Sequence, residues 1–291
     1  MTLYPVATID TPTDSMAEAD RRLLREAVKN LEHRSLATRL SLVLGQQISR
    51  FGKLLPANVT DIVDKAAERA ITIGLSAAMR SLNTRRGNDR RFFHKAAATL
   101  SGAAGGAFGL ASLPIELPVS TLLMLRSIAA IAKAEGEDLK DPETTFACIQ
   151  VFALGGQDVE QRLATDIDGK VDPHALTESG YFAVRAVLAQ SVSEAARFVV
   201  ERGLVEETAP VILRVVSQVA TRFGMIVSQK VAAQAVPIIG AAGGAAINYA
   251  FIDHFQTLAR GHFAVRRLER IYGPEVVRTA YDAALRETSF T

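Results

Sequence analysis

The chain has 291 residues, 48% of them hydrophobic and 22% charged, so it can bury the core of one large domain or two small ones. Its formal net charge of only +2 argues against a protein that binds polyanions over its whole surface. The single cysteine excludes an internal disulfide framework and fits a reducing compartment. The first residues lack the basic and apolar pattern of a signal peptide, so we expect a disordered tail at 1–14.

Apolar residues recur at helical spacing through most of the chain, and no stretch alternates with period two. Proline, glycine and aspartate mark the predicted ends, as in Asp141-Pro142-Glu143 and Gly273-Pro274-Glu275. Helices are expected over 15–54, 58–82, 142–154, 178–203, 206–235, 243–272 and 274–287, with a loop over 157–177. We therefore predict an all-α multi-helix bundle, with residues 15–291 in a single domain.

Two long stretches carry no charge, Ala96–Ile115 and Val231–Ile252, and both contain the hexapeptide GAAGGA. A turn is expected over Pro114–Pro118, which would make a hairpin of the first stretch and the apolar segment after it. Each stretch is long enough to span a bilayer. The first has only five large apolar side chains, however, which sum to about −2 kcal/mol of insertion free energy. Spanning is therefore not expected from composition.

Glycines four residues apart lie on one helix face and let another backbone approach closely. The glycines predicted to make such helix contacts are Gly102, Gly106, Gly109, Gly240 and Gly244. They fit the tightly packed core of a soluble bundle. They equally fit a hairpin that enters lipid or holds an apolar ligand.

Basic residues flank both uncharged stretches. The flanking set is Arg85, Arg86, Arg90, Arg91 and Lys95 before the first stretch, and Arg260, Arg266, Arg267 and Arg270 after the second. If the two stretches pack antiparallel, both clusters fall at one end and could contact anionic headgroups. Taken singly, each cluster is also what a solvated helix face looks like.

Glu116 stands between two prolines in apolar sequence, where an ionised carboxylate needs a partner. Arg126 or the free amides of a helix start could supply it, which makes a cap or an ion pair the main expectation. The alternative is a catalytic site in which Glu116 meets Asp253, His254 or His262.

Familiar motifs for metals, nucleotides and covalent catalysis are absent: the chain has no HExxH, CxxC, GxGxxG or GxSxG. Basic clusters without interleaved stacking aromatics do not favour nucleic acid. No metal, cofactor or nucleic acid is therefore expected.

Several ordered blocks resemble the EcsC family of bacterial proteins. They are LPIELPVSTLLMLRSIAAIAKAEGEDLKDPE, FALGG, GYFAVRAVLAQ and VPIIGAAGGAAINYAFIDHFQTLARGHFAVRRLERIYG, within about residues 91–281. The resemblance implies a helical, cytoplasmic, membrane-associated protein with a link to an ABC-type exporter or to the cell envelope. It implies no catalytic residues.

These observations lead to the expectation of a non-enzymatic protein that associates peripherally with the cytoplasmic face of the inner membrane. Its partners would be an anionic membrane surface or lipid, or a membrane protein such as a transporter. Two alternatives stay open: a hydrolase-like enzyme with a buried Glu, Asp and His site, and a soluble homo-oligomeric interaction protein.

Overall fold

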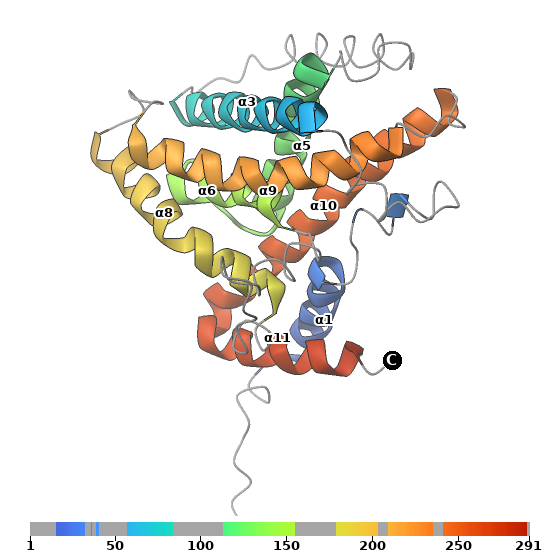
Figure 1. Cartoon of the computed structure of the whole chain (residues 1–291). Coiled ribbons are helices and arrows are strands. Elements are labelled where there is room, and N and C mark those ends of the chain that lie inside the picture. Colours follow the sequence, from blue (N-terminus) through green and yellow to red (C-terminus); the bar gives the residue numbers. More distant parts are fainter. Residues whose placement is uncertain are drawn as a thin grey trace, which may run out of the picture.

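The structure is a computed structural model that describes residues 16–32, 36, 39–40, 57–83, 113–154, 179–202, 209–234 and 241–289. Every regular element among these residues is a helix, which confirms the predicted all-α class (Figure 1). The elements are α1 (Glu18–Glu32), α3 (Ala57–Asn83), α5 (Leu113–Ala134), α6 (Pro142–Gln150), the 3₁₀ turn η5 (Val151–Ala153), α8 (Gly180–Arg202), α9 (Pro210–Gln234), α10 (Ala241–Tyr272) and α11 (Pro274–Ser289). The expected tail at 1–14 and the loop at 157–177 lie outside the described residues.

Short-range chemistry places the helix ends close to where the sequence predicts them. The Asp141 carboxylate accepts a hydrogen bond from the backbone N–H of Glu143 at 2.9 Å, and Pro142 is the first residue of α6. Pro210 likewise begins α9. Gly273, with φ of 86°, separates α10 from α11 in the left-handed conformation that glycine adopts without strain. Each boundary thus depends on residues within one helical turn of it.

The start of α5 corrects one prediction. The sequence predicts a turn over Pro114–Pro118, but α5 begins at Leu113 and continues through both prolines. Pro114 lies in the first turn, where its missing N–H would have no intrahelical partner. Pro118 removes one helical hydrogen bond and is buried, so its packing offsets the loss. The turn prediction is therefore wrong, and Glu116 belongs to the first turn of a helix.

The long helix α10 runs diagonally through the molecule, from the upper right of Figure 1 to the lower left. Above it, α3 packs against both α5 and α9. Below it, α1 and α11 pack against α10 and against each other. Four phenylalanine rings join η5, α9 and α10 with centroid separations of 5.1 to 6.3 Å: Phe152, Phe223, Phe251 and Phe255. This aromatic cluster is the centre of the core.

Two glycines that the sequence analysis did not single out bring helices close together. A Cβ atom on Gly261 of α10 would lie 2.7 Å from Leu31 Cγ and 3.2 Å from the carbonyl oxygen of Ala27, both on α1. A Cβ atom on Gly224 of α9 would lie 2.8 Å from the Asp64 carboxylate on α3. Glycine is therefore needed where α1 meets α10, whereas at Gly224 a larger residue would require only the Asp64 side chain to move.

Of the five predicted contact glycines, only Gly244 lies in the described residues. A Cβ atom on Gly244 would meet no atom of this part of the chain within 4 Å. Gly102, Gly106, Gly109 and Gly240 lie outside the described residues, so their contact role stays a prediction.

Replacing Gly261 by leucine should lower the free energy of unfolding by about 1–3 kcal/mol, because the side chain has no room beside Leu31. Gly244→Ala is the matched control within the same helix. It should be neutral or stabilising by up to about 1 kcal/mol, because alanine favours helix over glycine. Urea denaturation of both variants tests this contrast, and equal effects would mean that α1 does not pack closely on α10.

Candidate functional site

Glu116 takes part in a buried polar cluster that joins three helices. The Lys230 ammonium on α9 donates hydrogen bonds to Glu116 Oε1 at 2.9 Å and to Asn248 Oδ1 at 3.2 Å. The same Nζ lies 4.8 Å from the centre of the Phe251 ring, in cation–π distance. Only 1% of the Lys230 side chain is exposed, so two acceptors and the ring together replace its water shell. We refer to Glu116, Lys230 and Asn248 as the Lys230 cluster.

The partner of Glu116 is Lys230 rather than Arg126. Arg126 lies ten residues further along α5, roughly 15 Å along the helix axis, whereas the Lys230 side chain reaches from α9 to the first turn of α5. The expectation of an ion pair holds, but the cation comes from a segment 114 residues away in the sequence.

The Lys230 cluster brings residues from both uncharged stretches or their borders into contact. Glu116 directly follows the first stretch, and Asn248 lies within the second, three residues after its GAAGGA repeat. Two large apolar side chains are exposed next to the cluster: Ile115 at 65% and Tyr249 at 73%. We call the end of the molecule where α5 and α10 begin, with these two side chains, the apolar pole.

Lys230→Met should lower the free energy of unfolding by about 3–5 kcal/mol, because it leaves the half-buried Glu116 carboxylate without its cation. Adding Glu116→Leu to that variant should restore part of the loss, since an apolar pair of similar volume no longer buries a charge. Chemical denaturation of the two single variants and of the double variant gives a double-mutant cycle for this pair. Purely additive losses would contradict the pairing.

The second basic cluster is largely neutralised inside the protein. Its ion pairs are Arg266–Glu137, Arg266–Glu143, Arg267–Glu135 and Arg270–Glu137. Arg260 is exposed and is the member nearest to the second uncharged stretch. Residues 266–270 follow the start of α10 by 25 residues or more, roughly 38 Å along the helix. Of this cluster, Arg260 is therefore best placed to contact a surface that meets the apolar pole.

Glu137 is the acceptor that organises these arginines. Its side chain is only 5% exposed and accepts two hydrogen bonds from Arg266, at 2.9 and 3.3 Å, besides its contact with Arg270. Burial acts to raise the pKa of Glu137, but the hydrogen bonds and charges of the two arginines outweigh it and lower the pKa. These contacts fasten the α5–α6 connection to the end of α10. The first cluster, Arg85, Arg86, Arg90, Arg91 and Lys95, lies outside the described residues.

The candidate catalytic residues have separate partners. Asp253 pairs with Arg39, and His262 contacts Tyr181. His254 is fully buried beside Phe255. Glu116, Asp253 and His262 thus each contact a different partner, Lys230, Arg39 and Tyr181. Among the described residues, no group of three His, Cys, Asp or Glu side chains could hold a metal ion.

His262 belongs to a buried network that the sequence analysis did not anticipate. Its Nδ1 atom lies 2.9 Å from the Tyr181 hydroxyl, and Arg185 donates to that hydroxyl at 3.2 Å. Arg185 also donates two hydrogen bonds to Glu269, at 2.7 and 3.0 Å. The Tyr181 hydroxyl and His262 Nδ1 share one hydrogen bond, whose direction depends on the tautomer of His262. Nε2 has no hydrogen-bond partner among the described residues.

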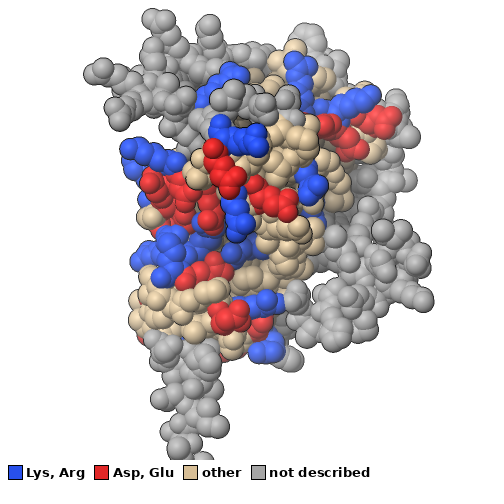
Figure 2. Space-filling view, turned by 90° about the vertical axis from the view of Figure 1, so that its left-hand side faces the viewer, with Lys and Arg blue, Asp and Glu red and all other residues tan. Residues whose placement is uncertain are grey.

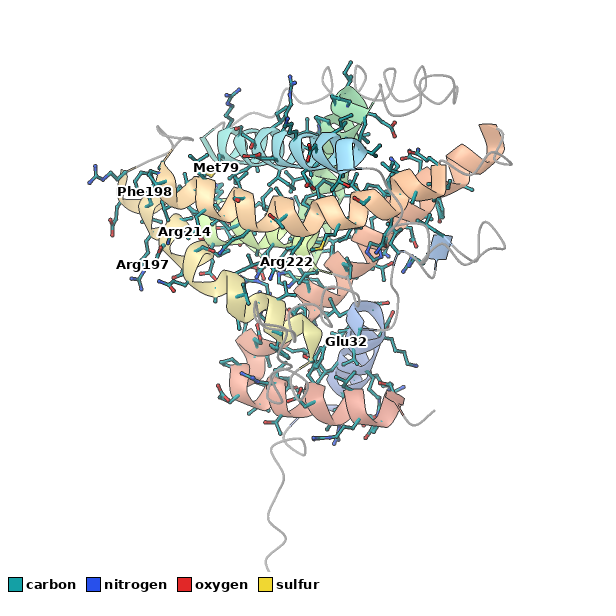
Figure 3. The ribbon with its side chains drawn as sticks, viewed as in Figure 1. Glu32, Met79, Arg197, Phe198, Arg214 and Arg222 are labelled. Atoms are coloured by element: carbon teal, nitrogen blue, oxygen red, sulfur yellow. The ribbon has the colours of Figure 1, made fainter. Side chains whose placement is uncertain are left out.

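A second carboxylate supports this network from α1. Glu32, labelled in Figure 3, accepts hydrogen bonds from the Tyr281 hydroxyl at 2.8 Å and from the backbone N–H of Tyr181 at 3.3 Å. The Tyr181 and Tyr281 rings stack with centroids 5.7 Å apart. Burial raises the pKa of Tyr181, so its hydroxyl stays protonated at neutral pH. These contacts connect α1, α8, α10 and α11 without an opening to solvent at His262.

The network predicts a pH dependence of stability. Burial lowers the pKa of His262 well below 6.5, and the charges of Arg185 and Arg266 act in the same direction. Below about pH 6.5 the unfolded chain therefore binds a proton at this residue that the folded chain does not. The free energy of unfolding should fall as the pH is lowered, by up to about 1.4 kcal/mol per pH unit from this residue.

Urea denaturation of the native protein and of His262→Phe between pH 7.5 and 5 measures that contribution as the difference between the two curves. The difference should shrink as the pH falls, since the variant has no group to protonate at this position. Parallel curves would mean that folded and unfolded His262 titrate alike.

A groove of about 530 Å³ opens between α6 and α8, with α10 at its floor. Three arginines and three carboxylates line it: Arg185, Arg197, Arg266, Asp141, Glu143 and Glu201. Figure 3 shows Arg197 at the edge of the molecule where α8 approaches α9. The face of the molecule at that edge carries basic and acidic side chains interleaved, without a broad patch of one sign (Figure 2).

Comparison with known proteins identifies a family and no activity. The sequence profile of the EcsC protein family matches residues 18–268, most of the chain. No curated protein matches, and no solved structure does.

Proposed function

We propose that this chain, which belongs to the EcsC protein family, associates peripherally with the cytoplasmic face of the inner membrane through its apolar pole. The observation that carries the proposal is the Lys230 cluster. Through Lys230 it joins Glu116, the residue after the first uncharged stretch, to Asn248 within the second. Two adjacent uncharged segments offer a larger apolar area to lipid than either alone.

Exposed side chains at the apolar pole support this orientation. Ile115 and Tyr249 gain from leaving water, and transfer of a large apolar side chain contributes roughly 1.5–3 kcal/mol. Tyrosine also suits an interface, because its ring prefers an apolar setting and its hydroxyl prefers water. Arg260 is exposed on the same helix as Tyr249 and would face anionic headgroups.

Peripheral contact fits the packing better than spanning. α5 and α9 are both long and apolar enough to cross a membrane, but half or more of each apolar window is already buried inside the bundle. Moving either helix into lipid would take it away from α3, which packs against both. The predicted Val231–Ile252 stretch is divided between the end of α9 and the start of α10, and residues 96–112 lie outside the described residues.

The partner at this pole would be anionic lipid or a membrane protein such as a transporter. An enzyme has less support, because Glu116, Asp253 and His262 each contact a different partner. A soluble homo-oligomer would cover the same pole with a second copy, and the experiment below distinguishes it.

Flotation with liposomes tests the membrane contact. The protein should float with vesicles of phosphatidylethanolamine and phosphatidylglycerol at low salt, and less with neutral phosphatidylcholine vesicles. Ile115→Asp with Tyr249→Asp should reduce the floated fraction several-fold, and so should Arg90→Glu with Arg91→Glu. Leu213→Asp, an exposed apolar position near the start of α9 and outside the groove between α6 and α8, is the control.

The melting temperature of each variant shows whether the fold is retained. The proposal would be refuted if no protein floated at low salt. It would also be refuted if the control variant reduced the floated fraction as much as the Ile115 and Tyr249 changes do. Light scattering that shows a stable dimer, dispersed by the Ile115 and Tyr249 changes, would favour the oligomer instead.

A further inference from the structure

The floor of the groove between α6 and α8 holds two fixed guanidinium groups. Glu269 holds Arg185 through two hydrogen bonds, and Glu137 holds Arg266 in the same way. The two arginine side chains keep 22% and 18% of their surface exposed, whereas the carboxylates behind them keep 15% and 5%. The donors that remain accessible are therefore on the groove side and are already oriented.

The α6 rim of the groove carries the opposite charge. Asp141 and Glu143 are both exposed, and Glu143 contacts Arg266 only at 3.5 Å. The three arginines and three carboxylates of the lining cancel, but Glu269 and Glu137, which pair with two of these arginines, leave an excess of negative charge, so a simple anion is not favoured. A molecule that carries both charges can satisfy both sides at once.

The α8 wall of the groove has an apolar stripe beside the polar Ser193, Arg197 and Glu201. Ala189, Val192, Ala196 and Val200 follow one another at spacings of three and four residues, which places them on one helix face. Val200, at the outer end, is an exposed large apolar residue. This stripe is roughly 16 Å long, because it covers eleven residue steps. Its small side chains leave room for an extended apolar chain beside them.

We propose that this groove binds a zwitterionic amphiphile. A phosphate or carboxylate would accept hydrogen bonds from Arg185 and Arg266, an ammonium group would meet Asp141 and Glu143, and an apolar tail would lie along the α8 stripe. The volume of about 530 Å³ is in the range of small-molecule sites. The groove lies on α6, α8 and α10 away from the apolar pole, so the proposal does not depend on membrane contact there.

Isothermal titration calorimetry with short-chain lipids, kept below their micelle concentration, tests the ligand class. Dihexanoyl phosphatidylethanolamine should bind at least ten-fold more tightly than dihexanoyl phosphatidylglycerol, which lacks the ammonium group. Phosphoethanolamine, the headgroup without tails, should bind at least ten-fold more weakly than the lipid. Equal affinity for the two lipids, or no binding of either, would overturn the proposal.

The titration with phosphoethanolamine also shows whether the ligand is a lipid or a soluble zwitterion. If phosphoethanolamine binds as tightly as the lipid, the ligand is a soluble zwitterion and the role of the apolar stripe is refuted.

Two variants test the placement. Ala196→Phe should fill the apolar stripe and abolish lipid binding, while Val187→Phe, an exposed position on α8 outside the groove, should not. Glu143→Gln should lower the affinity for dihexanoyl phosphatidylethanolamine at least five-fold. The affinity for dihexanoyl phosphatidylglycerol should not fall, because only the contact with the ammonium group is lost. Unchanged binding by Ala196→Phe in a folded protein would place the ligand elsewhere.

Discussion

The ammonium group of Lys230 is almost completely removed from water, so it must be neutralised inside the protein. Its partners come from the first turn of α5 and from the early part of α10. A buried charge is tolerated only with its hydrogen bonds in place, and this requirement fixes how α5, α9 and α10 meet.

α10 connects the distinct regions of the molecule. Its first turns belong to the apolar pole, His262 near its middle joins the buried tyrosine network, and Arg266 to Arg270 bind the α5–α6 connection. A single rigid helix therefore keeps the apolar pole and the charged groove apart. The proposed membrane contact and the proposed ligand groove therefore lie at different parts of this helix.

The arginines at the end of α10 are neutralised by ion pairs that cannot be read from the sequence. In sequence they look like a flank for anionic headgroups, but the Glu135-Gly136-Glu137 connection supplies carboxylates that hold three of them. Gly136, with φ of 83°, allows the tight turn that presents these glutamates to α10. The same neutralisation orients Arg266 toward the groove, where it contributes to a fixed pair of donors.

By itself, the sequence determined the helical class and most helix ends. Asp141 with Pro142, and Gly273 with Pro274, act on backbone groups within a few residues, so their effect can be derived without knowing the fold. Where a local signal failed, at Pro114–Pro118, burial outweighed the tendency of proline to end a helix.

Only the tertiary structure decided which charges pair, which glycines are in contact and where a groove opens. Lys230 and Glu116 are 114 residues apart, and Arg270 and Glu137 are 133 apart. Gly261 matters because Leu31 lies against it, not because of any repeat around it. Such contacts depend on how whole helices are oriented, and helical periodicity specifies the face of one helix without specifying its neighbour.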